Sequence, residues 1–394
     1  MMDIYELKNR EENDLFRTYK RLGIVIERGE GCYLYTDTGE KILDMFGGLA
    51  VNVLGYGHKK MNDAIKEQVD KYIHISNMFY QPNQVNLAEK IKKLSGFSRV
   101  FFSNSGTEAA EAAIKLIRKY FLGTEKTTLV SFTGSFHGRT MGALSLTARK
   151  KYREQFLPLL PDVVHLEFNS VSDLEKYNSS KTAGVFIECL QGEGGINPAT
   201  PEFIAKLNEL KQKYGFIIAA DEIQSGVGRT GTFNAFSQLG LDADIIIMAK
   251  GIGGGLPLGA IAGNERVKDV FTYGEHGSTF GGNPVAAASG LVVMDELEHG
   301  LMEKNKTHGE LLVYKLNVIK HKYPGKINEV RGMGLMLGIE LSSPAQPIVD
   351  ELIKRNVLVN CTNGNVIRLL PPYITTETEI ELFCRGFEEV ISRT

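Results

Sequence analysis

Residues 216–224 read FIIAADEIQ and residues 244–251 read DIIIMAKG. In each stretch a short apolar run ends at an ionisable side chain, Asp221 in the first and Lys250 in the second. Such runs, when they alternate with amphipathic helical patterns, are typical of a mostly parallel sheet covered by helices. Three further runs of this kind occupy residues 100–103, 128–132 and 184–188. The sequence therefore predicts an α/β fold.

The helical patterns and the two ends of the chain suggest how this fold is divided. Amphipathic stretches are expected at residues 85–94, 109–120 and 201–214, the first closed by Gly96. Residues 32–46, CYLYTDTGEKILDMF, predict two strands around a Thr-Gly turn, and an α+β pattern returns after about residue 298 and ends in a helix near 377–391. We expect a large domain at 58–297 and a smaller α+β domain built from 1–57 and 298–394.

Composition excludes several classes of function. The 394 residues carry 45 basic and 47 acidic side chains, so a strongly basic face for nucleic acid or an anionic membrane is not supported. The four cysteines stand far apart without a histidine at metal-ligand spacing, which predicts reduced thiols and no metal site. A charged N-terminus and the lack of any apolar stretch of 18 or more residues predict a cytoplasmic protein that acts on small molecules.

Two motifs that follow predicted strands could bind an anion and a planar ring. In SNSGTEA, at residues 103–109, Ser105 and Glu108 fit a capping box, and the N–H groups of Gly106 and Thr107 would suit a phosphate. In FTGSFHGRT, at residues 132–140, Phe136 could stack on a cofactor and Arg139 could bind a carboxylate. A capped helix without a ligand, a packed phenylalanine and a solvated arginine are the alternatives.

The two ionisable groups at strand ends suggest covalent chemistry. A buried Asp221 needs a cationic partner such as a protonated ring nitrogen, although it could also cap a helix. A desolvated Lys250 is a good Schiff-base nucleophile, although it could also extend to solvent. In HGSTFGGNP, at residues 276–284, hydroxyl groups could bind a second phosphate oxygen or complete a tight turn. Pyridoxal 5'-phosphate (PLP) requires a combination of four groups: a phosphate-binding segment, a stacking ring, a buried acid and a reactive lysine.

The motifs SNSGTEA, FHGRT, QGEGG, DEIQSGVGRTG, AKGIGGGLPLGA, HGSTFGGNP and IRLLPP occur in this order along nearly the whole chain. They resemble those of the class III, ω-amino-acid aminotransferases of PLP fold type I. The resemblance implies a homodimer with shared active sites, in which Thr279 reaches the phosphate of the neighbouring subunit. For the other cofactor contacts it implies a Schiff base at Lys250, a pyridine-nitrogen partner in Asp221, a phenolic-oxygen contact from Gln224, ring stacking by Phe136 with Ile223 on the other face, and phosphate binding by Gly106 and Thr107.

Within this family, residues 21–58 and 357–372 are most similar to acetylornithine aminotransferases of arginine biosynthesis. That similarity implies transfer of the amino group of N2-acetyl-L-ornithine to 2-oxoglutarate, which gives N-acetyl-L-glutamate 5-semialdehyde and L-glutamate. It also implies that Arg139 holds a substrate carboxylate and that Ser278 contacts acetylornithine. Arg368 would pair with Glu193 while the amino donor is bound and would then be released to bind a carboxylate of 2-oxoglutarate.

Other activities share most of these motifs. Ornithine, succinylornithine, succinyldiaminopimelate and 4-aminobutyrate remain alternative donors, although residues 46–49 lack the tyrosine that ornithine aminotransferases carry near this point. An NAD- or ATP-dependent enzyme is disfavoured, because the glycines at 251–255 do not form G-x-G-x-x-G and no Walker lysine follows residue 106. A non-catalytic binding protein of the same fold is disfavoured by the presence of Lys250 and Asp221.

Overall fold

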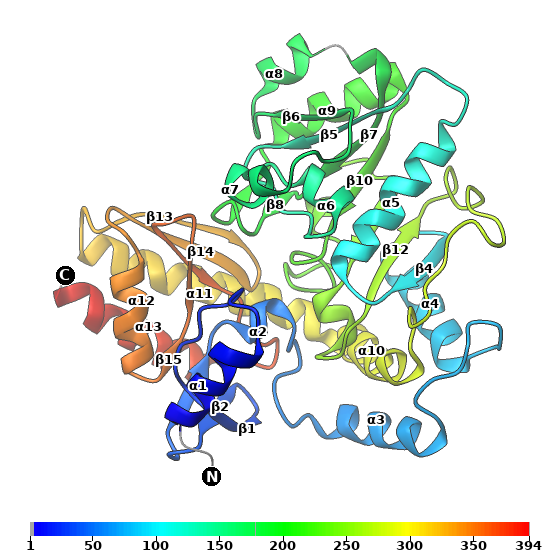
Figure 1. Cartoon of the computed structure of the whole chain (residues 1–394). Coiled ribbons are helices and arrows are strands. Elements are labelled where there is room, and N and C mark those ends of the chain that lie inside the picture. Colours follow the sequence, from blue (N-terminus) through cyan, green and yellow to red (C-terminus); the bar gives the residue numbers. More distant parts are fainter. Residues whose placement is uncertain (1–3, 178, 394) are drawn as a thin grey trace.

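A seven-stranded sheet forms the centre of the larger part of the molecule (Figure 1). The computed structural model describes residues 4–177 and 179–393. All neighbouring strands on one side of the sheet are parallel, from β11 through β10, β7 and β5 to β6, whereas β12 runs antiparallel to both β11 and β4. The strands are β4 (Arg99–Ser103), β12 (Gly259–Gly263), β11 (Ile245–Met248), β10 (Ile217–Asp221), β7 (Thr182–Ile187), β5 (Thr128–Phe132) and β6 (Val163–Leu166). The mostly parallel sheet predicted from the sequence is confirmed.

Both faces of this sheet are buried, which explains the continuous apolar runs. In β10 and β11, Ile217 and Ile245 pack with residues of α5, while Ile218 and Ile246 pack on the opposite face with residues of α9 and α10. Successive side chains of a strand point to opposite faces, so an unbroken apolar run is needed where helices cover both. The helices around the sheet are α3 (Lys59–Lys71), α4 (Pro82–Ser95), α5 (Gly106–Tyr120), α6 (Met141–Leu146), α7 (Lys150–Arg153), α8 (Val171–Lys176), α9 (Pro201–Tyr214) and α10 (Pro284–Glu296).

The smaller part of the molecule brings the two ends of the chain together (Figure 1). One sheet has the order β1-β2-β3-β15, in which Val357 pairs with Leu43, and a second has the order β13-β14-β17-β16. Its elements are β1 (Ile26–Glu30), β2 (Tyr33–Thr36), β3 (Lys41–Asp44), α2 (Gly47–Ala50), α11 (Met302–Lys322), β13 (Ile327–Met333), β14 (Met336–Leu341), α12 (Gln346–Lys354), β15 (Val357–Leu358), β16 (Asn360–Thr362), β17 (Val366–Leu369) and α13 (Glu377–Arg393). The domain boundaries after residues 57 and 297 stay a prediction.

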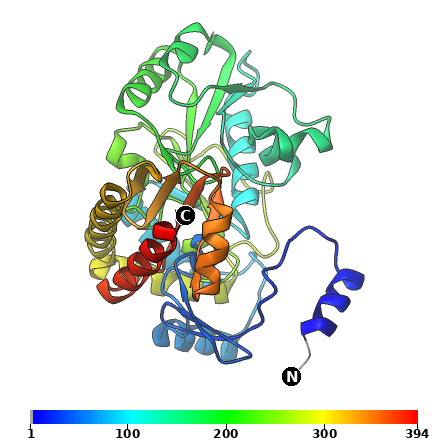
Figure 2. The ribbon, with the colours of Figure 1, turned by 90° about the vertical axis from the view of Figure 1, so that its left-hand side faces the viewer.

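The remaining elements are short. They are β8 (Leu190–Gln191), β9 (Asn197–Pro198), the 3-10 helices η1 (Glu154–Phe156), η2 (Ser179–Lys181), η3 (Ala235–Leu239) and η4 (Lys250–Gly253), and the π-helical η5 (Leu297–Leu301). The first helix, α1 (Ile4–Asp14), has no buried residue and stands apart from the body of the chain (Figure 2). Among the described residues, no helix has the length and apolarity that crossing a bilayer would require.

Candidate active site

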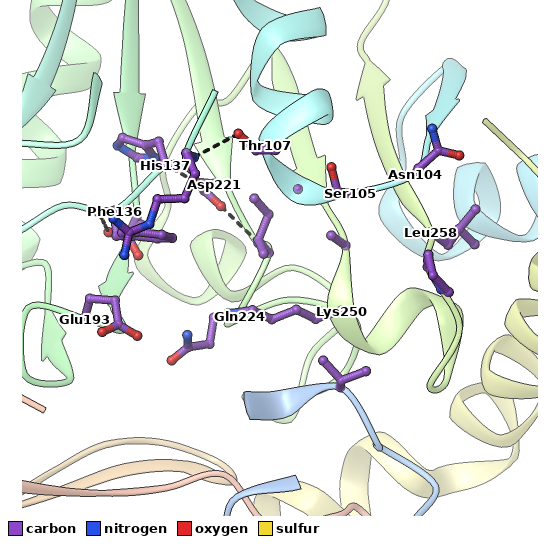
Figure 3. Close-up of a pocket in the computed structure, with 18 of the residues that line it drawn as sticks. Asn104, Ser105, Thr107, Phe136, His137, Glu193, Asp221, Gln224, Lys250 and Leu258 are labelled. Carbon is purple, nitrogen blue, oxygen red and sulfur yellow. Dashed lines mark hydrogen bonds and ion pairs between the residues drawn. The ribbon is translucent and has the colours of Figure 1, made fainter. Parts of the chain in front are cut away.

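A cavity of about 410 Å³ lies where β5, β10 and β11 end, beside the N-terminus of α5. Its size is within the range of small-molecule sites, and its position matches the rule that ligands bind at the carboxyl ends of parallel strands. Most of the predicted site residues line it together (Figure 3). They are Gly106, Thr107, Phe136, Arg139, Glu193, Asp221, Ile223, Gln224 and Lys250.

Lys250 follows β11 by two residues and reaches into this cavity (Figure 3). Its backbone has φ of 50°, a left-handed conformation that is uncommon outside glycine and is found more often at functional sites. Burial of the amine, reinforced by the positive charge of Arg368, lowers the pKa of Lys250 to about 8. A substantial fraction of this amine is therefore neutral, and so nucleophilic, near physiological pH.

Asp221 ends β10 and is almost fully buried. Its Oδ2 lies 2.7 Å from Nδ1 of His137, and its Oδ1 accepts a hydrogen bond from the N–H of Ile223 at 3.1 Å. Burial disfavours charge on His137, but the hydrogen bond and charge of Asp221 outweigh this and raise the pKa of the imidazole. His137 is therefore the cationic partner that the buried Asp221 requires within the chain.

Two further residues that line the cavity, His137 and its neighbour Glu188, were not predicted from the sequence. Glu188 accepts hydrogen bonds from the N–H groups of Phe136 at 3.1 Å and Gly192 at 3.4 Å. Burial raises the pKa of this carboxyl to about 7. The available signal was topological: β5 and β10 both pair with β7, so the residues that follow β5, β7 and β10 meet at one edge of the sheet.

The N-terminus of α5 forms one wall of the cavity. The Ser105 hydroxyl accepts from the N–H of Glu108 at 3.3 Å, as a capping box predicts, but the Glu108 carboxylate accepts from the N–H of Asn104 at 2.7 Å, one residue before the expected donor. A Cβ at Gly106 would lie 2.6 Å from Cδ1 of Ile223, so the backbone of Gly106 packs directly against this side chain. The first N–H groups of a helix lack intrahelical acceptors and can bind an anion, which fits the predicted phosphate site.

Two arginines lie beside the cavity. Nη1 of Arg368 lies 2.6 Å from Oε1 of Glu193 in an ion pair, as predicted. The charge of Arg368 overcomes the effect of burial and lowers the pKa of Glu193. The guanidinium of Arg139 lies over the rings of Phe136 and Tyr152, with its carbon 5.3 Å and 4.1 Å from their centroids. The cavity is therefore flanked by two cationic groups that can bind carboxylates.

Three predicted site residues do not line the cavity: Arg368, which reaches it through Glu193 and Gln224, and Ser278 and Thr279. Ser278 is next to it, because its hydroxyl oxygen accepts a hydrogen bond at 3.1 Å from the side chain of Asn104, which lines the cavity. Thr279 is exposed and does not line the cavity of its own chain. Its predicted contact would be with a neighbouring subunit.

The chemistry of the cavity fits PLP. An amine with a lowered pKa, a buried carboxylate, an aromatic ring and the first N–H groups of a helix are set around one space, and Gly106 lines it without a side chain. These are the groups that a phosphorylated pyridine aldehyde needs for its covalent link, its ring nitrogen, its ring face and its phosphate.

The family model for class III aminotransferases matches residues 16–391. The chain belongs to this family. The predictions of the family, of the type I fold and of an aminotransferase enzyme are thereby confirmed.

Individual relatives of this class III aminotransferase agree with the match. The chain is 43% identical to the acetylornithine aminotransferase of Archaeoglobus fulgidus over 94% of its length and 96% of that protein. It is 42% identical to that of Aquifex aeolicus, over 96% and 99% of the two chains. The solved ornithine aminotransferase of Toxoplasma gondii has a TM-score of 0.94 at 25% identity, over 100% and 96% of the two chains. A second structure of that protein contains PLP at partial occupancy in its active site, so the predicted cofactor is confirmed at the level of the family.

Proposed function

We propose that this protein is a PLP-dependent aminotransferase that converts N2-acetyl-L-ornithine and 2-oxoglutarate into N-acetyl-L-glutamate 5-semialdehyde and L-glutamate. The reaction belongs to arginine biosynthesis. The observation that carries the proposal is the joint lining of one cavity by Lys250, Asp221 and the Glu193 of the Glu193–Arg368 ion pair, in a chain about 40% identical to acetylornithine aminotransferases over nearly its whole length.

Each of the predicted residues would bind one part of the cofactor. Lys250 would form the covalent link, Asp221 would face the ring nitrogen, and Phe136 and Ile223 would contact the two ring faces. Gly106 and Thr107 would bind the phosphate, and Gln224 the phenolic oxygen. When bound, PLP supplies an electron sink for the carbanion formed at the substrate carbon.

The residues of the chain then handle binding and proton transfer. Arg139 binds a carboxylate of the amino donor and places its terminal amine near Lys250. Neutral Nζ of Lys250 takes the proton from the carbon that carries this amine and later releases it, acting as base and then as acid. Asp221, whose Oδ2 lies 2.7 Å from Nδ1 of His137, would stabilise positive charge at the ring nitrogen.

The Glu193–Arg368 pair lets one cavity accept two kinds of substrate. While Glu193 neutralises Arg368, a donor that has no second carboxylate is bound without a free cation beside it. When Glu193 turns away, Arg368 can bind a carboxylate of 2-oxoglutarate.

Glu193→Ala should change the relative use of donor and acceptor. Freed from its partner, Arg368 is expected to strengthen binding of dicarboxylates and to weaken use of acetylornithine, each by about 10-fold, because a hydrogen-bonded ion pair has been removed. Single-turnover rates of the two half-reactions would measure this effect. Unaltered rates in both would remove Glu193 from its role as a switch.

The proposed donor can be tested by adding N-acetylornithine and then 2-oxoglutarate to the PLP-loaded protein. We expect the visible absorption of the PLP form to disappear with the donor and to return with the keto acid. If acetylornithine leaves the band unchanged while ornithine, succinylornithine, succinyldiaminopimelate or 4-aminobutyrate bleaches it, the donor assignment is wrong and the aminotransferase assignment stands. Release of the band by hydroxylamine distinguishes a covalently bound cofactor from an adventitious chromophore.

We propose that the protein works as a homodimer in the cytoplasm, and that Thr279 of each subunit contacts the phosphate bound in the other. Exposed apolar side chains near this residue support the proposal, namely Met78, Phe79, Tyr80 and Phe280. Large exposed apolar clusters are typical of protein interfaces. The free cysteines are consistent with a reducing compartment.

Sedimentation of the protein should give twice the mass of one chain. Thr279→Ala should speed the loss of PLP without dissociating the dimer. A stable monomer would contradict shared active sites.

A further inference from the structure

The guanidinium of Arg368 is held by acceptors from three separate segments. Nη1 donates to Glu193 Oε1 at 2.6 Å and to Gln224 Oε1 at 3.2 Å, while Nε donates to Oδ1 of Asn360 at 3.1 Å. The side chain of Arg368 is 2% exposed. A buried guanidinium keeps one orientation only if its donors are satisfied, so the contacts that remain when Glu193 leaves decide where this group points.

The Asn360 contact is built into the sheet. Asn360 on β16 pairs directly with Arg368 on antiparallel β17, which places their side chains on the same face and within reach of each other. The amide nitrogen of Asn360 donates to the carbonyl of Cys361 at 3.3 Å, which turns Oδ1 toward Nε of Arg368. This contact does not involve Glu193, so turning of the Glu193 side chain leaves it intact.

The backbone of Glu193 is tied to the same sheet. Its carbonyl accepts hydrogen bonds from the hydroxyl of Thr362 at 2.9 Å and from the guanidinium of Arg149. Withdrawal of the carboxylate can therefore occur by rotation of the side chain alone. The position of β16, and with it the Asn360 contact, is preserved.

Gln224 forms the second contact that remains. A Cβ at Gly192 would lie 2.4 Å from Oε1 of Gln224, so the backbone of Gly192 packs directly against this amide. In Figure 3 the Gln224 amide lies between Glu193 and Lys250. Its oxygen faces Arg368, which supports one orientation of the amide.

We propose that Asn360 is a positioning residue that keeps Arg368 aimed at the substrate cavity while Glu193 is withdrawn. The inference rests on the proposed exchange of Glu193 for a carboxylate of 2-oxoglutarate. Because Asn360 occupies Nε, the incoming carboxylate must bind the two terminal nitrogens, and this restricts it to one direction of approach. Asn360 thus acts in the half-reaction with 2-oxoglutarate, whereas in the donor half-reaction Glu193 itself holds Arg368.

This role predicts an asymmetric effect of Asn360→Ala. The second-order rate constant with 2-oxoglutarate should fall about 10-fold, the effect of losing one hydrogen bond to a charged group. The single-turnover rate with acetylornithine should change by less than about 2-fold, because the Glu193 pair remains. Equal losses in both half-reactions, or no loss in either, would overturn the proposal.

Asn365→Ala is the matched control. Asn365 precedes β17 and donates to the carbonyl of Leu341 at 3.1 Å, so its loss removes an asparagine hydrogen bond from the same sheet without a contact to Arg368. It should leave the ratio of the two half-reactions at the wild-type value. If Asn360→Ala does not fold, Asn360→Ser, which shortens the acceptor, should show the same asymmetry.

Binding of glutarate, a dicarboxylate that cannot accept an amino group, gives a readout independent of turnover. Calorimetric titration of the PLP-loaded protein should show about 10-fold weaker glutarate binding in Asn360→Ala and unchanged binding in Asn365→Ala. Equal affinities for Asn360→Ala and wild type, or no glutarate binding to wild type, would overturn the proposal. A wild-type protein that binds glutarate in an Asn360-dependent way but does not react with acetylornithine would instead contradict the proposed donor.

Discussion

Replacing Lys250 with alanine is expected to lower kcat by about 10⁴-fold or more, because in the proposed mechanism this one side chain is both the covalent attachment and the proton-transfer group. The loss should appear in both half-reactions. Addition of a small amine such as ethylamine should restore part of the rate, since it can act as base in the space left by the side chain. Lys213→Ala, at an exposed position of α9, is the matched control and should have wild-type rates.

The Lys250→Ala protein should remain folded. The pKa of Lys250 is lowered to about 8, so the folded protein disfavours the charged amine that the unfolded chain carries at pH 7. Removing this group should therefore leave the Tm at pH 7 unchanged or higher. Normal multiple-turnover rates would exclude Lys250 from catalysis, whereas an unfolded variant would show that its role is structural.

Replacing Asp221 with alanine is expected to damage both stability and activity. His137 would lose its partner while completely buried, and breaking a buried ion pair in this way destabilises a protein by about 3–5 kcal/mol. The same change removes the carboxylate that we propose faces the ring nitrogen, so we expect kcat to fall by about 10²–10³-fold in protein that is still folded. Urea unfolding and single-turnover kinetics measure the two effects separately.

A double-mutant cycle would show whether Asp221 and His137 act as a pair. The Asp221→Ala, His137→Ala protein should be destabilised by clearly less than the sum of the two single variants, because neither charge is then left alone. Additive losses would mean that the 2.7 Å contact does not couple them. Asp221→Asn, which keeps the shape and the acceptor for Ile223, should lose activity more than stability.

The sequence predicted the central sheet well because its strands carry their own signal. The apolar runs at β5 and β11 match the observed strands at both ends, since burial on two faces requires uninterrupted apolar residues. Strand β12 was not predicted. Its sequence, GAIAG, is short and rich in glycine, and it lies between β11 and β4 because of long-range pairing rather than local preference.

Local sequence signal also distinguishes the site residues that were predicted from those that were missed. Lys250 and Asp221 follow apolar runs, where an ionisable side chain is conspicuous. His137 and Asn360 depend on which segments become neighbours: His137 on the packing of the loop after β5 against β10, and Asn360 on the register of β16 against β17. Neither relation is encoded in local spacing, so both required the folded chain.

The pairing of β3 with β15 also affects how the protein is made. The ribosome releases the N-terminal strands first, but their sheet cannot be completed until Val357 and Leu358 have been synthesised. At about 5–20 residues per second, this delay is on the order of tens of seconds. Until then the nascent chain exposes the unpaired edge of β3. A chaperone bound at residues 41–44 before synthesis ends would keep this edge from pairing with other chains.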